Sequence, residues 1–289
     1  MEKKLVNTFL LGFPKSGTTA LYYFFRAHPD IYAPEVKEPN FFSKHNLSCS
    51  YMKKAKGHEL YFNEYINLFD NAYPINVDCS TSYIRDIKSL KNIHKYNSSA
   101  KIIVILRNPL EIVSSWHYQK IKEGQEQEYS FKRVFLSDMD TIYDMDHLVR
   151  IDTLDYRKVG SIRKQISNVK ILFQKENILI IDYVELKHNP HDVQHKITDF
   201  LGIKYKPFTI PVKNKTNRVV NNTLRKLSRR LHLQEIAKLL NISFLSYIAK
   251  NVLSKEYNKD KNIQFLKKNG FFKSDVEFYH NFFVKKNER

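Results

Sequence analysis

Residues 5–29 read LVNTFLLGFPKSGTTALYYFFRAHP, and this stretch decides the fold. The apolar run Leu5–Leu11 predicts a buried strand, which Gly12 and Pro14 end. Lys15–Thr19 then opens a helix whose apolar residues recur at helical spacing. Such a corner presents backbone N–H groups to an anion, because the first turn of a helix has unpaired donors and carries the positive end of the helix dipole.

A plain strand–turn–helix corner with Ser16 or Thr18 as the N-cap is the simpler alternative. A cap needs one hydroxyl, however, and this loop has three together with a lysine, so we favour an anion site. The spacing from Gly12 to Gly17 matches the loop that binds nucleoside triphosphates, but Thr18 occupies the position of its lysine. The lysine lies earlier, at Lys15, which indicates a related cradle with different chemistry.

The loop resembles the 5′-phosphosulfate loop of sulfotransferases that use 3′-phosphoadenosine 5′-phosphosulfate (PAPS). The family signature P-K-[ST]-G-T-[TS] matches Pro14–Thr19, and the helix that often ends in H-P ends here at His28-Pro29. The resemblance implies an α/β fold of the P-loop-like type, with three layers, a central parallel sheet flanked by helices, and a C-terminal helical extension. It also implies that the donor is held by Lys15, Ser16, Gly17, Thr18 and Thr19.

A second match follows at Glu38-Pro39-Asn40-Phe41-Phe42. The prolines on either side of Glu38 disfavour helix, so we expect an ordered loop with Phe41 and Phe42 as apolar anchors. From this segment alone, Glu38 is best interpreted as a surface charge paired with Lys37. Sulfotransferases of the glycosaminoglycan-modifying and bacterial types carry E-x-x-F-F here, and the resemblance implies that Glu38 is the catalytic base.

Lys101–Leu106 is the clearest strand in the sequence, and its unbroken apolar run is typical of a central parallel strand. Arg107 follows this strand at the crevice where α/β folds bind ligands, and Ser115 lies about two helical turns into the next helix. The spacing resembles the family's 3′-phosphate motif, R-x-P-x-x-x-x-x-S. It implies that Arg107 and Ser115 bind the 3′-phosphate, for which the planar arginine fork is suited.

A short strand is expected at Pro74–Cys79, where the family has a segment that lines the acceptor side. Glycosaminoglycan-type members have a catalytic lysine after the acidic residue, whereas this chain has Cys79, which argues against a heparan-like polymer as acceptor. We interpret Cys79 as a small buried residue. Further helices are predicted at 59–69, 157–175 and 274–283, with another between Asn189-Pro190 and the C-cap glycine Gly202.

Composition limits the class of protein. The chain has 289 residues, of which 42% are hydrophobic and 13% aromatic, so a disordered protein is excluded. No apolar run approaches the roughly 20 residues of a membrane span. Two cysteines give neither a disulfide framework nor metal-ligand spacing. We expect no targeting segment, no metal and a cytoplasmic protein, with peripheral contact at the inner membrane face as an open alternative.

The net charge of +18 is concentrated towards the C-terminus, where residues 204–289 hold 20 Lys and Arg against 6 Asp and Glu. A field of that sign attracts anions. Lys213–Asn222 is expected to be a loop, and Arg218 is a candidate ligand of the donor's 3′-phosphate by resemblance. Leu224–Leu240 predicts a basic amphipathic helix that packs on the domain or lies on an anionic membrane. We expect a PAPS-binding domain over 1–223 and a basic extension over 224–289.

The sequence therefore predicts a sulfotransferase that moves a sulfuryl group from PAPS to a hydroxyl or amine, with Glu38 as base and Lys15 stabilising the leaving phosphate. The expected acceptor is a carbohydrate. The alternative is a small-molecule kinase that uses ATP–Mg²⁺, with Asp78 or Asp182 as the magnesium ligand. A third interpretation, a basic protein that binds nucleic acid or membrane, explains the charge but not the anion loop, and no nucleic-acid motif is present.

Overall fold

A computed structural model of the chain describes residues 6–43, 58–123, 126, 130–136, 155–209, 219–220, 254–255 and 259–283. The chain forms two compact units. The first comprises Met1–Val113, Arg157–Lys213 and Phe272–Arg289, and the second comprises Ser114–Tyr156 and Asn214–Phe271. The division expected at residue 223 falls outside the described residues, so it stays a prediction.

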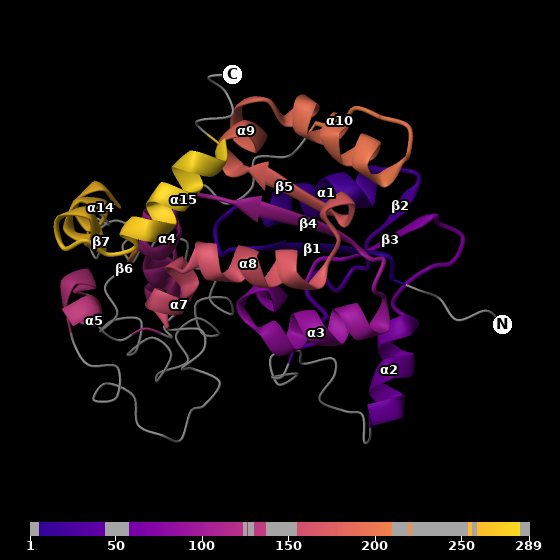
Figure 1. The fold of residues 1–289 in the computed structure, drawn as a ribbon, viewed down its shortest axis with the longest axis horizontal. Helices are drawn as coiled ribbons and strands as arrows, with labels where there is room; N and C mark the ends of the chain where they lie inside the picture. The colour runs from indigo at the N-terminus through magenta and orange to yellow at the C-terminus, as the bar shows by residue number, and fades with distance from the viewer. Residues whose placement is uncertain are drawn as a thin grey trace, which may run out of the picture. The chain divides into compact units, whose positions relative to one another are not determined.

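The first unit is built on a five-stranded sheet with parallel neighbours (Figure 1). The strand order is β2-β3-β1-β4-β5. β1 is buried along its whole length and β4 along all but its first residue, because unbroken apolar runs suit strands that are covered on both faces. The strands are β1 (Thr8–Gly12), β2 (Ile31–Tyr32), β3 (Ile75–Asp78), β4 (Lys101–Leu106) and β5 (Ile178–Asp182).

The strand order reverses at β1, in the middle of the sheet. The chain passes from β1 to the edge strand β2, returns through β3 on one side of β1 and crosses to β4 on the other side. In open α/β sheets, ligands bind at such a switch point, outside the carboxyl ends of the strands. Gly12, Asp78 and Leu106 end the three central strands, so the anion loop, the segment after β3 and Arg107 all begin at this edge.

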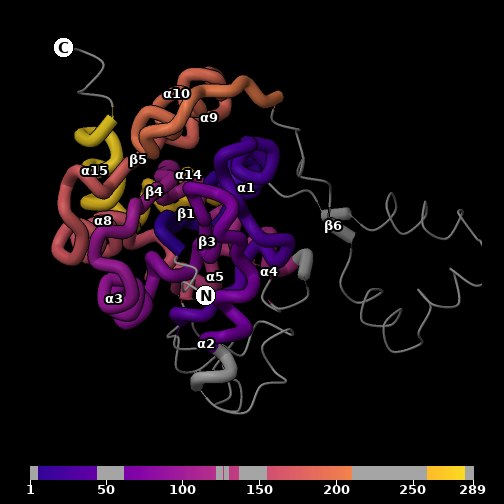
Figure 2. Tube along the Cα trace, turned by 90° about the vertical axis from the view of Figure 1, so that its right-hand side faces the viewer, coloured from indigo at the N-terminus to yellow at the C-terminus, as the bar shows by residue number. Residues whose placement is uncertain are grey.

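Helices cover both faces of the sheet, which confirms the predicted three-layer, P-loop-like fold. Figure 2 shows α3 and α8 on one side of the strands and α1 on the other. α4 (Pro109–Glu123) and α7 (Tyr156–Gly160) contain the boundaries between the two units. The other helices of the first unit are α1 (Thr18–Ala27), α2 (His58–Ile66), α3 (Ile87–Tyr96), α8 (Ile162–Leu172), α9 (Tyr183–His188), α10 (Pro190–Leu201) and α15 (Lys273–Phe283), with the 3₁₀ helices η3 (Thr81–Arg85) and η6 (Lys175–Asn177).

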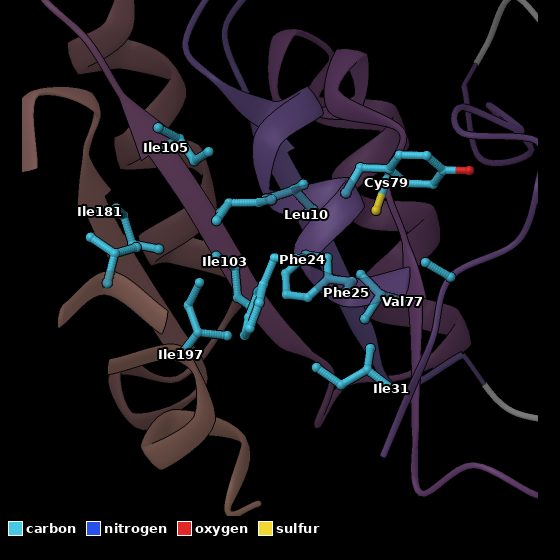
Figure 3. Close-up of a cluster of buried hydrophobic side chains, with 14 of the residues drawn as sticks. Leu10, Phe24, Phe25, Ile31, Val77, Cys79, Ile103, Ile105, Ile181 and Ile197 are labelled. Atoms are coloured by element: carbon cyan, nitrogen blue, oxygen red, sulfur yellow. The ribbon is translucent and has the colours of Figure 1, made fainter. Parts of the chain in front are cut away.

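An apolar cluster fixes α1 to the sheet and so fixes the start of that helix. Figure 3 shows Phe24 and Phe25 of α1 among side chains of β1, β3, β4 and α10. Both phenylalanines are fully buried, as are Leu10 and Ile103 beside them. Each such side chain contributes about 1.5–3 kcal/mol on burial. The N-terminus of α1 is therefore held rigidly at the end of β1.

The single helix predicted over 157–175 is wrong, because the chain forms α7 and α8 with a break at Ser161. The ring of Phe272 packs against Gly160 so closely that a Cβ there would lie 2.3 Å from a ring carbon. Ser161 Oγ donates to the carbonyl of Arg157 at 2.8 Å, which satisfies an acceptor that the interrupted helix leaves free. The break thus lies beside a contact with a residue far along the chain.

The C-terminal helix α15 packs on α8 of the first unit, as predicted for residues 274–283. The hydroxyl of Tyr279 donates to Asp182 Oδ1 at 2.8 Å, and Asp275 Oδ1 accepts from the backbone N–H of Arg163 at 2.8 Å. Burial raises the pKa of the Tyr279 hydroxyl, and the bond to Asp182 raises it further, so this group remains a donor.

The second unit contains most of α4, together with α5 (Phe131–Leu136) and α14 (Lys259–Lys268). Its described core is aromatic, with the rings of His117, Phe131 and Tyr156 in edge contact. β6 (Val219–Val220) pairs antiparallel with β7 (Ser254–Lys255), so part of the loop predicted over 213–222 is a strand. The basic helix predicted at 224–240 lies outside the described residues.

Candidate functional site

The loop after β1 has an unusual backbone, with two residues in the left-handed region. Lys15 and Gly17 both have positive φ, of 63° and 90°, and Ser16 N–H donates to the carbonyl of Phe13 at 3.2 Å. A lysine in the left-handed region costs of order 1–3 kcal/mol, which surrounding contacts must offset. One such contact comes from Arg107, whose NH1 donates to the carbonyl of Lys15 at 2.5 Å. Alternating right- and left-handed residues of this kind form concave anion-binding nests.

Ser16 supplies the observation that most directly indicates a ligand. Its side chain is fully buried, and its Oγ has no hydrogen-bond partner among the described residues. Leaving a buried hydroxyl unpaired costs about 1–3 kcal/mol. Gly17 is the N-cap of α1 and offers no side-chain cap, so the donors of the helix start stay directed outward. Backbone amides and hydroxyls at a helix N-terminus fit a phosphate or sulfate group.

Both loop glycines are required by close packing. A Cβ on Gly12 would lie 2.8 Å from Thr18 Cγ2, and one on Gly17 would lie 3.1 Å from Leu186 Cδ2 and from Tyr183 Cδ2. The loop is therefore fitted between its own helix and α9. Gly202, by contrast, also has positive φ, at 70°, but has no atom within 4 Å of a built Cβ.

This contrast gives a matched pair of substitutions. Gly202→Ala is expected to cost about 1–2 kcal/mol of unfolding free energy from left-handed strain alone. Gly17→Ala adds overpacking of about 1–3 kcal/mol against α9 and displaces the amides of the anion loop. Urea unfolding of both variants measures the difference. Equal losses in the two variants would show that the loop is not packed as described.

Arg107 joins the anion loop to the end of β4. Its Nε and NH2 both approach Glu111 Oε2, at 2.8 and 2.7 Å, and its guanidinium lies 4.4 Å from the centre of the Tyr183 ring. With the bond to the Lys15 carbonyl, three of its five N–H groups have partners, so two remain for a ligand. The ion pair with Glu111 gives Arg107 a structural role, which exists beside any role in binding.

The two other residues predicted to bind phosphate are Ser115 and Arg218, and the structure does not position either of them beside the anion loop. Ser115 is a partly buried residue of α4 that belongs to the second unit. Arg218 lies outside the described residues. The structure thus brings together Lys15, Ser16 and Arg107, and leaves Ser115 and Arg218 as predictions from the motif.

Glu38 lies in an ordered segment, and its side chain is 36% exposed. Oε1 is 3.0 Å from Lys37 Nζ and accepts from Thr81 Oγ1 at 3.3 Å. Phe41 stacks on Tyr65 with ring centres 4.5 Å apart, and Phe42 is buried. The phenylalanines therefore anchor the segment, as expected. The pairing with Lys37 that the local sequence favoured is present as well, so the carboxylate has a cation and a hydroxyl beside it.

Asp78, at the end of β3, forms the centre of a buried polar network. Its Oδ2 accepts from the hydroxyls of Tyr65 at 2.9 Å and Tyr83 at 3.1 Å, and its Oδ1 accepts from Ser80 N–H at 2.8 Å. Burial raises the pKa of the Asp78 carboxyl, while these hydrogen bonds act in the opposite direction. Burial, followed by the charge of Asp78, raises the pKa of both tyrosines well above the usual range, so they stay donors.

Both aspartates that would serve a kinase are occupied. Asp78 is fully buried with three donors, and Asp182 Oδ1 accepts from Val184 N–H and from Tyr279. Both oxygens of Asp78 are therefore engaged in the fold, and one oxygen of Asp182 is engaged as well. No group of three His, Cys, Asp or Glu residues in the described ranges is placed to hold a metal ion.

Cys79 is fully buried beside this network, which agrees with its interpretation as a small core residue. Burial raises the pKa of its thiol well above the usual range, so the group stays protonated. Sequence reasoning missed the partnership of Glu111 with Arg107, the bond of Thr81 to Glu38, and the meeting of Tyr65 and Tyr83 at Asp78. The spacing of four residues from Arg107 to Glu111 on a helix was the one available signal, because such pairs face each other.

The fold and the site together define an α/β protein with a glycine-bounded loop at the switch point of its sheet. A family model described as the sulfotransferase domain matches residues 6–288. The chain belongs to this sulfotransferase family, which confirms the resemblance seen in its motifs and does not favour a kinase.

Curated relatives are distant and longer than this chain. Carbohydrate sulfotransferase 15 of Mus musculus is 22% identical over 247 residues, which cover 69% of this chain and 44% of the relative. The bifunctional heparan sulfate N-deacetylase/N-sulfotransferase 4 of Mus musculus is 26% identical over 201 residues, covering 67% of this chain and 22% of the relative. The chain thus spans less than half the length of these two proteins.

A solved sulfotransferase from Alicyclobacillus acidocaldarius superposes with a TM-score of 0.59 at 22% identity, and the match covers 84% of this chain and 98% of the other. This likeness supports the fold. Among the described residues, no helix is both long and apolar enough to cross a membrane.

Proposed function

We propose that this chain transfers a sulfuryl group from PAPS to a hydroxyl or amine of a carbohydrate acceptor. The buried, unpartnered hydroxyl of Ser16 in the loop at the switch point carries the proposal, because it calls for an anionic ligand at the place where the family binds its donor. The relatives, a carbohydrate sulfotransferase and a bifunctional heparan sulfate N-deacetylase/N-sulfotransferase, support the acceptor class.

The donor end of the proposed site consists of the anion loop and Arg107. When bound, PAPS supplies an activated sulfuryl group on a good leaving phosphate. The Ser16 hydroxyl and the amides and hydroxyls of residues 17–19, with the Lys15 ammonium, would hold the 5′-phosphate and stabilise the charge that grows on it. Arg107 would use its two remaining N–H groups on the 3′-phosphate, together with Ser115 and Arg218. These cations belong to the protein, so the proposal includes no metal.

The acceptor end consists of the segment that carries Glu38. The carboxylate would accept the proton of the attacking hydroxyl or amine. Lys37 Nζ and Thr81 Oγ1 both donate to Glu38 Oε1, and these bonds would orient the carboxylate. We place the acceptor on this side of the loop, because β3 and β1 are neighbours and the Glu38 segment is bonded to the turn that follows β3.

The direct test uses PAPS labelled in its sulfuryl group with three separate acceptors. These are N-desulfated heparin oligosaccharides, a neutral glycan pool and a pool of small alcohols and phenols. We expect label on one of the glycan fractions, and product analysis then separates O- from N-sulfation. Label found on the small alcohols alone would reject the carbohydrate acceptor. Transfer of the γ-phosphate of ATP in place of sulfate would reject the reaction itself.

A further inference from the structure

The segment that carries Glu38 is hydrogen-bonded to the residues that follow β3. The backbone N–H of Asn40 donates to Ser80 Oγ at 2.9 Å, and the backbone N–H of Phe42 donates to the hydroxyl of Tyr83 at 3.2 Å. Asn40 has a positive φ of 54°, and its side chain donates to the carbonyl of Glu38 at 2.9 Å. These bonds fix the backbone on which Glu38 stands.

Two tyrosines share one carboxylate oxygen in this network but differ in what else they contact. The hydroxyls of Tyr65 and Tyr83 both donate to Asp78 Oδ2. The hydroxyl of Tyr83 also accepts the N–H of Phe42, whereas among the described residues the hydroxyl of Tyr65 bonds to Asp78 alone. Both side chains are fully buried and both remain protonated. Of the two tyrosines, Tyr83 is therefore the one that links the fixed carboxylate to the Glu38 segment, beside the link through Ser80.

We propose that Tyr83 is a positioning residue for the reaction. Its hydroxyl bonds both the buried Asp78 carboxylate and the backbone of the segment that holds Glu38, so it fixes that segment relative to Asp78. The inference rests on the proposed function, in which Glu38 is the base. Asp78 is fixed by β3 and by three donors, so it provides a rigid reference point. A misplacement of about 1 Å in a reacting group can cost about 10²-fold in rate. Small shifts of the segment therefore matter for proton transfer.

The test compares Tyr83→Phe with Tyr65→Phe. Each variant removes one buried hydroxyl from the same carboxylate oxygen and keeps the ring, so the loss of a donor to Asp78 is the same in both. Only Tyr83→Phe leaves the N–H of Phe42 without its acceptor. We expect Tyr83→Phe to lower kcat by at least about 10-fold more than Tyr65→Phe, with an unchanged Kd for 3′-phosphoadenosine 5′-phosphate (PAP). The assay uses labelled PAPS with N-desulfated heparin, or the fraction that accepted label in the transfer screen.

Hydrogen exchange gives a second readout that needs no acceptor. Tyr83→Phe should speed exchange at the amide of Phe42 relative to both wild type and Tyr65→Phe. In a Glu38→Gln background, adding Tyr83→Phe should change the residual rate by less than about 2-fold, because a residue that acts through Glu38 loses its effect there.

Equal kcat and equal exchange in the two tyrosine variants would overturn the inference. An undiminished effect of Tyr83→Phe in the Glu38→Gln background would overturn it as well. Wild-type turnover by Glu38→Gln alone would instead reject the proposed base. In that case the exchange measurement still decides whether Tyr83 holds the segment, so the two failures are distinguishable.

Discussion

Replacing Glu38 by glutamine is expected to lower kcat by about 10²–10⁴-fold while the Kd for PAP stays at its wild-type value. The amide keeps the shape of the side chain but cannot accept the acceptor's proton at neutral pH. Glu38 is partly exposed, and its pairing with Lys37 is a surface contact, so the fold should tolerate the change. Steady-state kinetics with labelled PAPS, beside calorimetric titration with PAP, measure the two effects separately.

Glu35→Gln is the matched control for this experiment. Glu35 lies three residues away in the same segment, its side chain is 89% exposed, and it is 3.7 Å from Arg26. The substitution removes one carboxylate from the same segment and should leave kcat unchanged. If Glu38→Gln turns over as fast as Glu35→Gln, Glu38 is not the base.

Replacing Arg107 by alanine is expected to weaken PAP binding by about 10²-fold, since hydrogen bonds to charged groups contribute about 1.5–3 kcal/mol each. The loss has two sources. The variant removes the N–H groups proposed for the 3′-phosphate, and it removes the bond that holds the Lys15 carbonyl in the anion loop. Kd values for PAP and for adenosine 5′-phosphate separate these sources, because adenosine 5′-phosphate has no 3′-phosphate and reports on the loop alone.

Stability must be separated from binding in this variant, because it leaves Glu111 without its cation. The double variant Arg107→Ala/Glu111→Ala removes the stranded carboxylate and should recover unfolding free energy without recovering affinity for PAP. Recovery of wild-type PAP affinity in the double variant would show that Arg107 acts on the fold and not on the ligand.

Much of the fold could be predicted because its signals are local. Residues 101–106 form a strand with the predicted bounds, since an unbroken run of β-branched apolar residues favours a central parallel strand. The helix that begins at Pro190 ends at Gly202 in the predicted left-handed conformation, because only the cap residue needs positive φ. The anion loop was predictable for the same reason, as its glycines, hydroxyls and lysine are adjacent in the sequence.

Features that depend on distant residues could not be predicted. The ring of Phe272 packs on Gly160, next to the break at Ser161, from more than 100 residues later in the chain. The network around Asp78 draws its donors from α2 and η3, and no spacing in the sequence shows that two tyrosines meet at one carboxylate. The left-handed conformation of Lys15 is likewise held by a hydrogen bond from Arg107, the residue that follows β4. The site thus depends on tertiary contacts that join local motifs.

The central claim is that the anion loop binds a 3′,5′-bisphosphorylated adenosine, and thermal unfolding tests it most directly. At about 100 times its Kd, PAP should stabilise the protein by about 2.7 kcal/mol. For a chain of this size that corresponds to a rise in Tm of about 5–10 °C. ATP–Mg²⁺ at the same concentration should give a smaller rise. A Tm that rises with ATP–Mg²⁺ and does not respond to PAP would contradict the account.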